Sequence, residues 1–454
     1  MLCRQKVRCA PLAMNGRWLG CILGCLLATN ASGQAFLSEN ESMAPDNSAI
    51  RVVFDSATAP IGEAIPAPLT LADLEQMALQ NNPSLRVAFA NVNAARGRQI
   101  QGGLKPNPQI GYFGMDIGEE DTAGQHGGFV SKEFVTGGKL RLNRAVAGQE
   151  IQEMQYRLSA QEQRVLNDVR LRFYDALVAQ RQVELTNDLL RTSTQLTNSS
   201  HQLLEAQQIS QSDVLQAEIE AEETAIAAAN AKNQSEEAWR RLAAVVGISA
   251  SNQQPLSGSL DDDIPIYTWE ETYARVLVEN PDLAASQARV RRSRLAIERA
   301  RRENVPNVEV MASVSHMHQS DEDVAGIQIG IPIPICNRNQ GNIFEAESNL
   351  VAAENNIRRL ELDLQDRLAM AFRRYANARQ QVERYQQQIL PRAQQSLDLV
   401  GAGYREGQVD FLALLTSQRT YIRVNLAYVA ALAELRQAST VIEGQLLTES
   451  LQPQ

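Results

Sequence analysis

The sequence is poor in aromatic residues and lacks long hydrophobic runs. Only 5% of its 454 residues are Phe, Trp or Tyr. No stretch after the first 35 residues reaches the ~18 consecutive apolar residues that a membrane-spanning helix needs. Ala, Gln, Leu, Arg and Glu instead fill long stretches with few Gly or Pro. This composition is typical of long helices and coiled coils, and it argues against a series of ordinary compact domains.

Cysteine is almost absent outside the N-terminus. Four of the five cysteines (Cys3, Cys9, Cys21 and Cys25) lie in the first 35 residues, and only Cys336 lies beyond them. If the N-terminal segment is removed, neither an internal disulfide nor a Cys-based zinc site can form. Cys21 or Cys25 could alternatively become a lipidated N-terminus, since each follows a Gly after apolar residues.

The first 35 residues have the pattern of a secretory signal peptide. Arg17 precedes an apolar run from Trp18 to Ala28, which is too short to cross a bilayer. Gly33 and Ala35 fit the −3 and −1 positions of a cleavage site. We therefore expect residues 1–35 to direct export, with a buried N-terminal helix as the alternative.

The charge balance argues against binding to nucleic acid. The chain has 43 basic and 53 acidic residues, a formal net charge of −10, and four of the basic residues lie in the signal segment. An acidic chain without a compact basic motif is a poor partner for a phosphate backbone. We also find no phosphate loop, catalytic triad or zinc-protease motif, so we expect neither enzyme activity nor a cofactor.

The rest of the chain is an internal duplication of one unit. LTLADLEQMALQNNPSL (69–85) reappears as YTWEETYARVLVENPDL (267–283), 198 residues later. Apolar residues between 151 and 173 recur 199 residues on, at the spacing of one helix face. We expect an extended N-terminal arm at 36–68, a first repeat at 69–248, a linker at 249–265, a second repeat at 266–447 and a tail at 448–454.

Each repeat has the same predicted order of elements. A short helix ends near Gln80 or Glu279, and Asn82 or Asn280 then caps a second helix that begins with proline. Two strands follow, and then a helical hairpin. The long helices are expected at 139–203 and 338–400, and their return helices at 211–246 and 411–443.

The strands have alternating apolar residues. We expect them at 108–117 and 128–135 in the first repeat, and near 307–314 and 326–335 in the second. Ile327, Ile329 and Ile331 would face lipid, although a soluble half-buried sheet shows the same alternation. Four strands cannot close a membrane barrel alone, because known barrels start at eight. Several chains would have to contribute to one barrel.

These features together resemble the TolC family of outer-membrane efflux proteins over residues 69–447. The segment IPIPICNRNQGNI (331–343) is similar to the strand-to-helix junction of the CzcC-like branch, which is associated with cobalt, zinc and cadmium resistance. TGGKL (136–140) is the corresponding junction of the first repeat. The match in the second repeat depends on Pro332, Pro334, Asn337, Arg338, Gln340 and Gly341.

The resemblance implies a homotrimer in the outer membrane. Twelve strands would form one β-barrel, and twelve long helices a hollow periplasmic α-barrel. The implied partners are outer-membrane lipid, a periplasmic adaptor (membrane fusion) protein and an inner-membrane RND-type pump, and the duct itself would be passive. Heavy-metal cations are the expected cargo. The alternatives are a duct for organic solutes or proteins, or a soluble periplasmic coiled-coil adaptor.

The resemblance also assigns residues at the periplasmic tip. Tyr404 and Asp213 match positions that help to close the aperture in the family. The arginine of that network falls on Val409 and the acidic constriction on Ala413 and Thr416, so Arg405 is the candidate replacement. Gly407 matches the family's turn glycine, while Ser210 and Asp410 have the chemistry of helix N-caps. A solvated first-turn carboxylate is the alternative for Asp213.

The four histidines give a further candidate. His316 and His318 end a predicted strand on one face, and three acidic residues follow from Asp321. They are weak candidates for transient binding of a soft metal, with a polar loop as the alternative. His126 and His201 are isolated in the sequence.

Overall fold

The computed structural model describes residues 68–118, 123–251, 253–261 and 265–452. The chain divides into two units, Met1–Ala64 and Ile65–Gln454, and every described residue belongs to the second. The expected signal peptide, with Cys21 and Cys25, and the expected arm up to residue 67 therefore lie outside the described residues.

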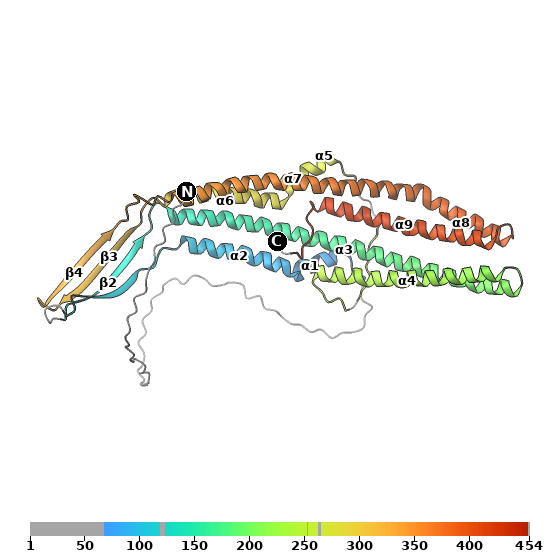
Figure 1. Ribbon diagram of the computed structural model, residues 1–454, viewed down its shortest axis with the longest axis horizontal. Coiled ribbons are helices and arrows are strands. Elements are labelled where there is room, and N and C mark those ends of the chain that lie inside the picture. The colour runs from blue at the N-terminus through green and yellow to red at the C-terminus, as the bar shows by residue number, and fades with distance from the viewer. Residues whose placement is uncertain (1–67, 119–122, 252, 262–264, 453–454) are drawn as a thin grey trace, which may run out of the picture. The chain divides into compact units, whose positions relative to one another are not determined.

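The two halves repeat one order of elements, as the sequence predicted (Figure 1). The first half contains α1 (Leu71–Asn81), α2 (Pro83–Gly103), β1 (Gln109–Met115), β2 (Gln125–Phe134), α3 (Lys139–Glu205) and α4 (Gln211–Val246). The second contains α5 (Trp269–Glu279), α6 (Pro281–Arg302), β3 (Val308–Met317), β4 (Glu322–Gly330), α7 (Gln340–Arg384), the π-helical turn η2 (Tyr385–Ile389), α8 (Leu390–Arg405) and α9 (Phe411–Glu443). The prediction of duplicated helical hairpins with four strands is confirmed.

Two buried asparagines start the second helix of each half. Asn82 Oδ1 accepts a hydrogen bond from Ser84 N at 2.9 Å, and Asn280 Oδ1 accepts one from Asp282 N at 2.9 Å. Each side-chain amide also donates to a backbone carbonyl, at 2.7 Å to Val245 O near the end of α4 and at 3.2 Å to Gln445 O just beyond α9. Each asparagine thus caps one helix and ties it to another that is distant in sequence.

The hairpins are made of long helices. α3 has 67 residues, which corresponds to about 100 Å at 1.5 Å per residue. The strands adjoin the start of α3 and α7, and tight turns join α3 to α4 and α8 to α9 at the other end (Figure 1). The strands and the hairpin turns therefore lie at opposite ends of the long helices.

One proline changes the long helix of the second half. Pro391 was expected only as a breaker, but the helix continues from Gln340 to Arg405 through η2, which lies immediately before α8. Proline lacks an N–H and its ring clashes with the carbonyl four residues earlier. A single π-helical turn relieves that clash by widening the backbone. α3 has no such turn.

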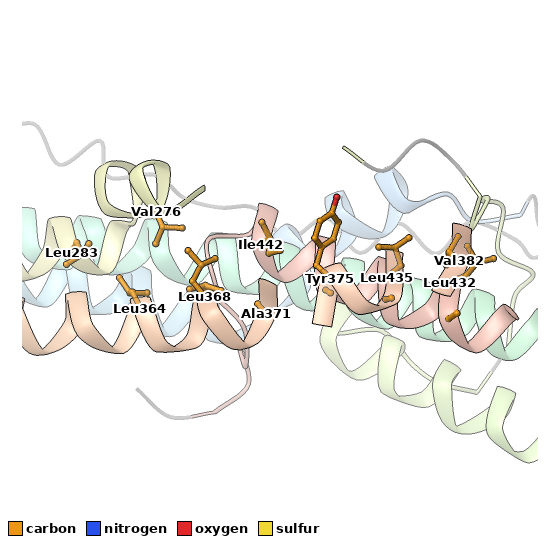
Figure 2. Close-up of a cluster of buried hydrophobic side chains, with 14 residues drawn as sticks. Val276, Leu283, Leu364, Leu368, Ala371, Tyr375, Val382, Leu432, Leu435 and Ile442 are labelled. Atoms are coloured by element: carbon orange, nitrogen blue, oxygen red, sulfur yellow. The ribbon is translucent and has the colours of Figure 1, made fainter. Parts of the chain in front are cut away.

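Each half has its own apolar core where its helices meet. Residues of the repeated apolar pattern are central to both, including Val169, which has no exposed surface, in the first half and Leu368, likewise fully buried, in the second. Figure 2 shows the core of the second half, which is formed by residues of α5, α6, α7 and α9, among them Val276, Leu283, Leu364, Leu368, Leu432, Leu435 and Ile442. The cores hold the short helices and the return helices against α3 and α7.

The four strands form one antiparallel sheet in the order β1-β2-β3-β4. β2 and β3 join the two halves, with Val130 opposite Ala312 and Phe134 opposite Val308. Among the described residues, β1 and β4 each pair along one side only. The sheet of one chain therefore has two unpaired edges.

The prediction that a strand includes Ile331 and continues to residue 335 is wrong. β4 ends at Gly330, and Ile331, Ile333 and Ile335 lie beyond it in an exposed segment without ladder pairing. Pro332 and Pro334 lack the N–H groups that a continuing ladder requires. The alternating pattern was real, but the two prolines prevent a strand there.

The C-terminal segment, residues 444–452, lies against α3. Asn167 Nδ2 donates to Gly444 O at 2.8 Å and to Leu447 O at 2.7 Å. The carboxylate of Asp168 accepts from the backbone N–H groups of Glu449 and Ser450, at 3.0 and 2.6 Å. This segment is therefore held by buried polar side chains as well as by apolar packing.

Candidate functional site

The turn between α3 and α4 ends in a capping box. Ser210 Oγ accepts from Asp213 N at 3.3 Å, while the Asp213 carboxylate accepts from Ser210 N at 2.9 Å and from Ser210 Oγ at 2.7 Å. These hydrogen bonds, the side-chain one first, hold the pKa of Asp213 below its usual value. Asp213 therefore stays ionised at neutral pH and stabilises the first turn of α4.

The turn between α8 and α9 has the same backbone path. Gly407 has a φ of 70°, and Gln207 has a φ of 58° at the matching position of the first turn. Glycine adopts this left-handed conformation at little cost, whereas glutamine is strained there. Asp410 Oδ1 accepts from Ala413 N at 2.9 Å and so caps α9.

The residues assigned to aperture closure lie close to these caps. The Tyr404 ring packs on the Phe411 ring, with centroids 6.2 Å apart. Burial raises the pKa of Tyr404, and the negative charge of Asp213 adds to the effect. In the described part of the chain, no hydrogen bond joins these two side chains, since Asp213 is bonded to Ser210. Arg405 Nε donates to Gly401 O of its own helix at 3.2 Å.

Two contacts between the hairpins near this tip were not predicted. Ala217, Phe411 and Leu415 form a small buried cluster, with Leu196 and Tyr404 packed against it. Farther along α9, the Arg419 guanidinium hydrogen-bonds to Glu220 of α4. The apolar periodicity of one helix does not show which side chains of the other hairpin it contacts. The sequence therefore carried no signal for these contacts.

The exposed residues of β1 and β4 include large apolar side chains. On β4, Ile327 is 80% exposed and Ile329 65%, while Ile110 and Tyr112 of β1 are also exposed. Ile327 lies opposite Ala312 and Ile329 opposite Val310 on β3. Exposed apolar side chains on a sheet whose edge strands are unpaired favour contact with lipid or with another chain.

The strand-to-helix junction of the second half is held by its own polar side chains. Asn337 Oδ1 accepts from Asn339 N at 2.9 Å, and Gln340 Oε1 accepts from Arg338 N at 2.8 Å. Asn339 has a φ of 60° and donates through Nδ2 to Ala300 O of α6 at 2.8 Å. Asn339 is therefore the residue of this turn that has the left-handed backbone conformation. Gly341 already lies inside α7.

The two histidines that are isolated in the sequence have neighbours in the fold, and His201 Nε2 lies 3.2 Å from Glu218 Oε1. His126 is not isolated, because it lies opposite His316 across β2 and β3. The His318 ring is 5.5 Å from the His126 ring and 4.9 Å from the His316 ring, centroid to centroid. His316 also contacts Asp323 at 3.0 Å. Over the described ranges, however, no three His, Cys, Asp or Glu side chains are grouped so that they could hold a metal ion.

Within the described parts of the chain, no helix is both long and apolar enough to cross a membrane.

The chain belongs to the outer membrane efflux protein family, whose model matches residues 74–248 and 272–444. Among characterised proteins, it is 25% identical over 417 residues to the cobalt-zinc-cadmium resistance protein CzcC of Cupriavidus metallidurans, covering 90% of this chain and 96% of that protein.

Solved structures have the same fold. A structure of CusC, from a study of folding and transmembrane channel formation, has a TM-score of 0.71 at 17% identity and covers 87% of this chain and 96% of that one. The open-state structure of the MtrE outer membrane channel of Neisseria gonorrhoeae has a TM-score of 0.69 at 20% identity, covering 83% of this chain and 89% of that one.

Proposed function

We propose that this chain is the passive exit duct of a tripartite efflux pump that exports heavy-metal cations across the outer membrane. The observation that carries the cargo is the similarity to the cobalt-zinc-cadmium resistance protein CzcC, which extends over nearly the whole length of both chains. The junction at 331–343, with Pro332, Pro334, Asn337, Arg338, Gln340 and Gly341, supports the same branch. We propose no catalytic step and no cofactor for the duct.

The proposed duct is a homotrimer. The described part of one chain supplies four strands with two unpaired edges, and a closed sheet leaves no edge in the hydrocarbon layer. Three copies would give a twelve-stranded barrel, above the eight strands at which membrane barrels begin. Ile327 and Ile329 would then face lipid, while Ile331 would lie at the start of the junction.

The helical end is proposed to meet a periplasmic adaptor and, through it, an inner-membrane RND-type pump. The two hairpin turns lie at the helix ends farthest from the strands, and this separation supports an adaptor contact at the turns. Ser210, Gly407 and Asp410 would shape these turns. Asp213, Tyr404 and Arg405 would line the aperture between them.

Export of the chain is proposed to depend on residues 1–35 as a signal peptide, with Cys21 or Cys25 as a candidate lipidation site. A signal peptide would deliver the chain through the inner membrane, after which the strands could assemble in the outer membrane.

The cargo is tested in a deletion strain. Loss of the duct should make cells accumulate zinc, cobalt, cadmium, copper or silver and become sensitive to the same metals, and the intact gene should restore both. If the strain instead loses resistance only to dyes and antibiotics, the cargo is an organic solute and the metal proposal is wrong, although the duct proposal stands.

A further inference from the structure

A cavity of about 690 Å³ lies between α2, α3, α6 and the C-terminal segment. The three helices lie side by side, with α3 in contact with both α2 and α6 (Figure 1). Ser450, Leu451 and Gln452 of the C-terminal segment also line the cavity, and none of the lining residues belongs to the hairpin turns or to the sheet. Its volume is in the range of pockets that bind small organic molecules.

Both carboxylates of the cavity wall are already paired with arginine. Asp282 contacts the guanidinium of Arg164, which also lines the cavity. Glu153 is 1% exposed, and its carboxylate lies 2.9 Å from Arg157 Nη2 and 3.0 Å from Arg292 Nη1. Because Arg292 neutralises Glu153 without lining the cavity, the positive charge of Arg157 is in excess there.

Arg289 of α6 adds a second uncompensated positive charge. It lines the cavity and is exposed, and within the described ranges of the chain its guanidinium has neither a hydrogen bond nor an ion pair. The Arg157 side chain is 52% exposed, so it is also accessible from the cavity. Two accessible guanidinium groups without a free carboxylate attract an anion, and each can hold a carboxylate through two parallel hydrogen bonds.

The C-terminal segment brings an unpaired buried hydroxyl to the same cavity. Ser450 is 1% exposed, and its Oγ has no hydrogen-bond partner among the described residues. The backbone of Ser450 is held on both sides, since Gln161 Nε2 donates to its carbonyl at 2.7 Å and its N–H donates to Asp168 at 2.6 Å. A buried hydroxyl without a partner is unfavourable, and a ligand oxygen in the cavity would satisfy it.

The remaining wall is apolar and incompletely covered. Val87 and Ala88 of α2, Met154 of α3, Leu360 of α7 and Leu451 line it. Val87 is 61% exposed and Leu451 is 50% exposed. A hydrocarbon or aromatic group placed against them would remove this apolar surface from water. The cavity therefore combines a cationic wall with an apolar wall.

We propose that this cavity binds a small organic acid, whose carboxylate lies between Arg157 and Arg289 and whose apolar body packs on Val87 and Leu451. The site goes beyond the proposed duct function, because its ligand is not the exported cation. Three residues of the C-terminal segment line the cavity, so the bound acid ties that segment to α2 and α6.

Isothermal titration calorimetry of the purified full-length protein in detergent tests the proposal with two acids. The first is 2-naphthoate, a soluble aromatic carboxylate, and the second is decanoate, a short fatty acid. Saturable binding of either acid supports the site, and the tighter one identifies the source of the ligand. Titration into detergent alone corrects for uptake by micelles. Uncharged 2-naphthamide should bind at least about tenfold more weakly than 2-naphthoate, because it cannot form charge-assisted hydrogen bonds.

Variants separate the charge of the cavity from its shape. Arg289→Ala should weaken binding of the acid at least about tenfold. Arg302→Ala is the matched control, because Arg302 is exposed at the end of α6, does not line the cavity and has no side-chain hydrogen bond or ion pair in the described chain. Its affinity should equal that of the wild type. Ala88→Trp fills the cavity without removing a charge and should abolish binding.

Hydrogen–deuterium exchange locates the bound acid. Addition of the acid should slow exchange of the C-terminal segment in the wild type and in Arg302→Ala, but not in Ala88→Trp. The proposal is overturned if neither acid binds the wild type, if 2-naphthamide binds as tightly as 2-naphthoate, or if Arg289→Ala and Ala88→Trp bind like the wild type. None of these outcomes bears on the duct proposal, which the deletion strain tests separately.

Discussion

Asn167→Ala is expected to release the C-terminal segment from α3. The Asn167 side chain is 2% exposed, and its amide donates to two backbone carbonyls, Gly444 O and Leu447 O, at 2.8 and 2.7 Å. Alanine cannot donate to either. Gly444 O still accepts from Leu447 N at 3.0 Å, so only Leu447 O loses its partner. A buried acceptor without a partner costs about 1–3 kcal/mol, and the local attachment should weaken by that amount.

Little space is available for another group to replace the lost hydrogen bonds of Asn167. A Cβ built on Gly444 would lie 2.0 Å from Asn167 Nδ2, which shows how closely the backbone approaches this side chain. Alanine would leave space that one water could occupy, and a water that bonded both carbonyls would bring the cost toward the lower end of that range.

Hydrogen–deuterium exchange of the intact protein in detergent measures the effect locally. A loss of about 1–3 kcal/mol in the opening free energy corresponds to exchange that is roughly 5- to 140-fold faster. The increase should be confined to residues 444–452 and the contacting turns of α3. Asn355→Ala is the matched control, because exposed Asn355 donates only to Val351 O of its own helix, at 2.8 Å. Equal exchange of residues 444–452 in wild type and Asn167→Ala would refute the argument.

Three further predictions address the core, the sheet edge and the tip. Leu368→Ala should destabilise the protein by about 2–5 kcal/mol, because the side chain is fully buried, and should lower the thermal midpoint of the helical circular-dichroism signal. Ile329→Asp should reduce trimer yield, at a cost of up to about 2–4 kcal/mol that depends on depth in the bilayer, whereas Gln328→Asp on the opposite face should not. The double variant Asp213→Ala, Tyr404→Phe should raise single-channel conductance at unchanged trimer yield. Unchanged conductance would limit both residues to capping and packing.

Local features were the most predictable from the sequence. Asn82 and Asn280 precede prolines, and such pairs determine helix starts through contacts within three residues. Gly407 and Asp410 likewise mark the second hairpin turn through short-range backbone preferences. The return helices therefore begin and end where the sequence predicted, at 211–246 and 411–443.

Contacts between distant segments were not predictable in the same way. Asn167 and Gly444 meet across 277 residues, and His126 and His316 meet because β2 and β3 join the two halves. Arg419 contacts Glu220 because the second hairpin packs on the first. Periodicity defines the buried face of one helix but does not define which residue of another element it meets.

The strand limit was missed for a different reason. Alternation of isoleucines from Ile327 to Ile335 obeys the period of a strand, but Pro332 and Pro334 remove two backbone donors. Here the backbone hydrogen bonding outweighed the side-chain pattern, and β4 ends at Gly330. Pro391 had the opposite outcome, because a single π-helical turn accommodated it within a long helix.

Membrane fractionation tests the central claim most directly. Cell envelopes are washed with high salt and separated on a density gradient, and the chain is followed by immunoblot. An outer-membrane efflux duct should stay with the outer-membrane fraction after the wash and should leave it only in detergent, as a trimer. Release of the chain by salt as a monodisperse, water-soluble monomer would contradict the account.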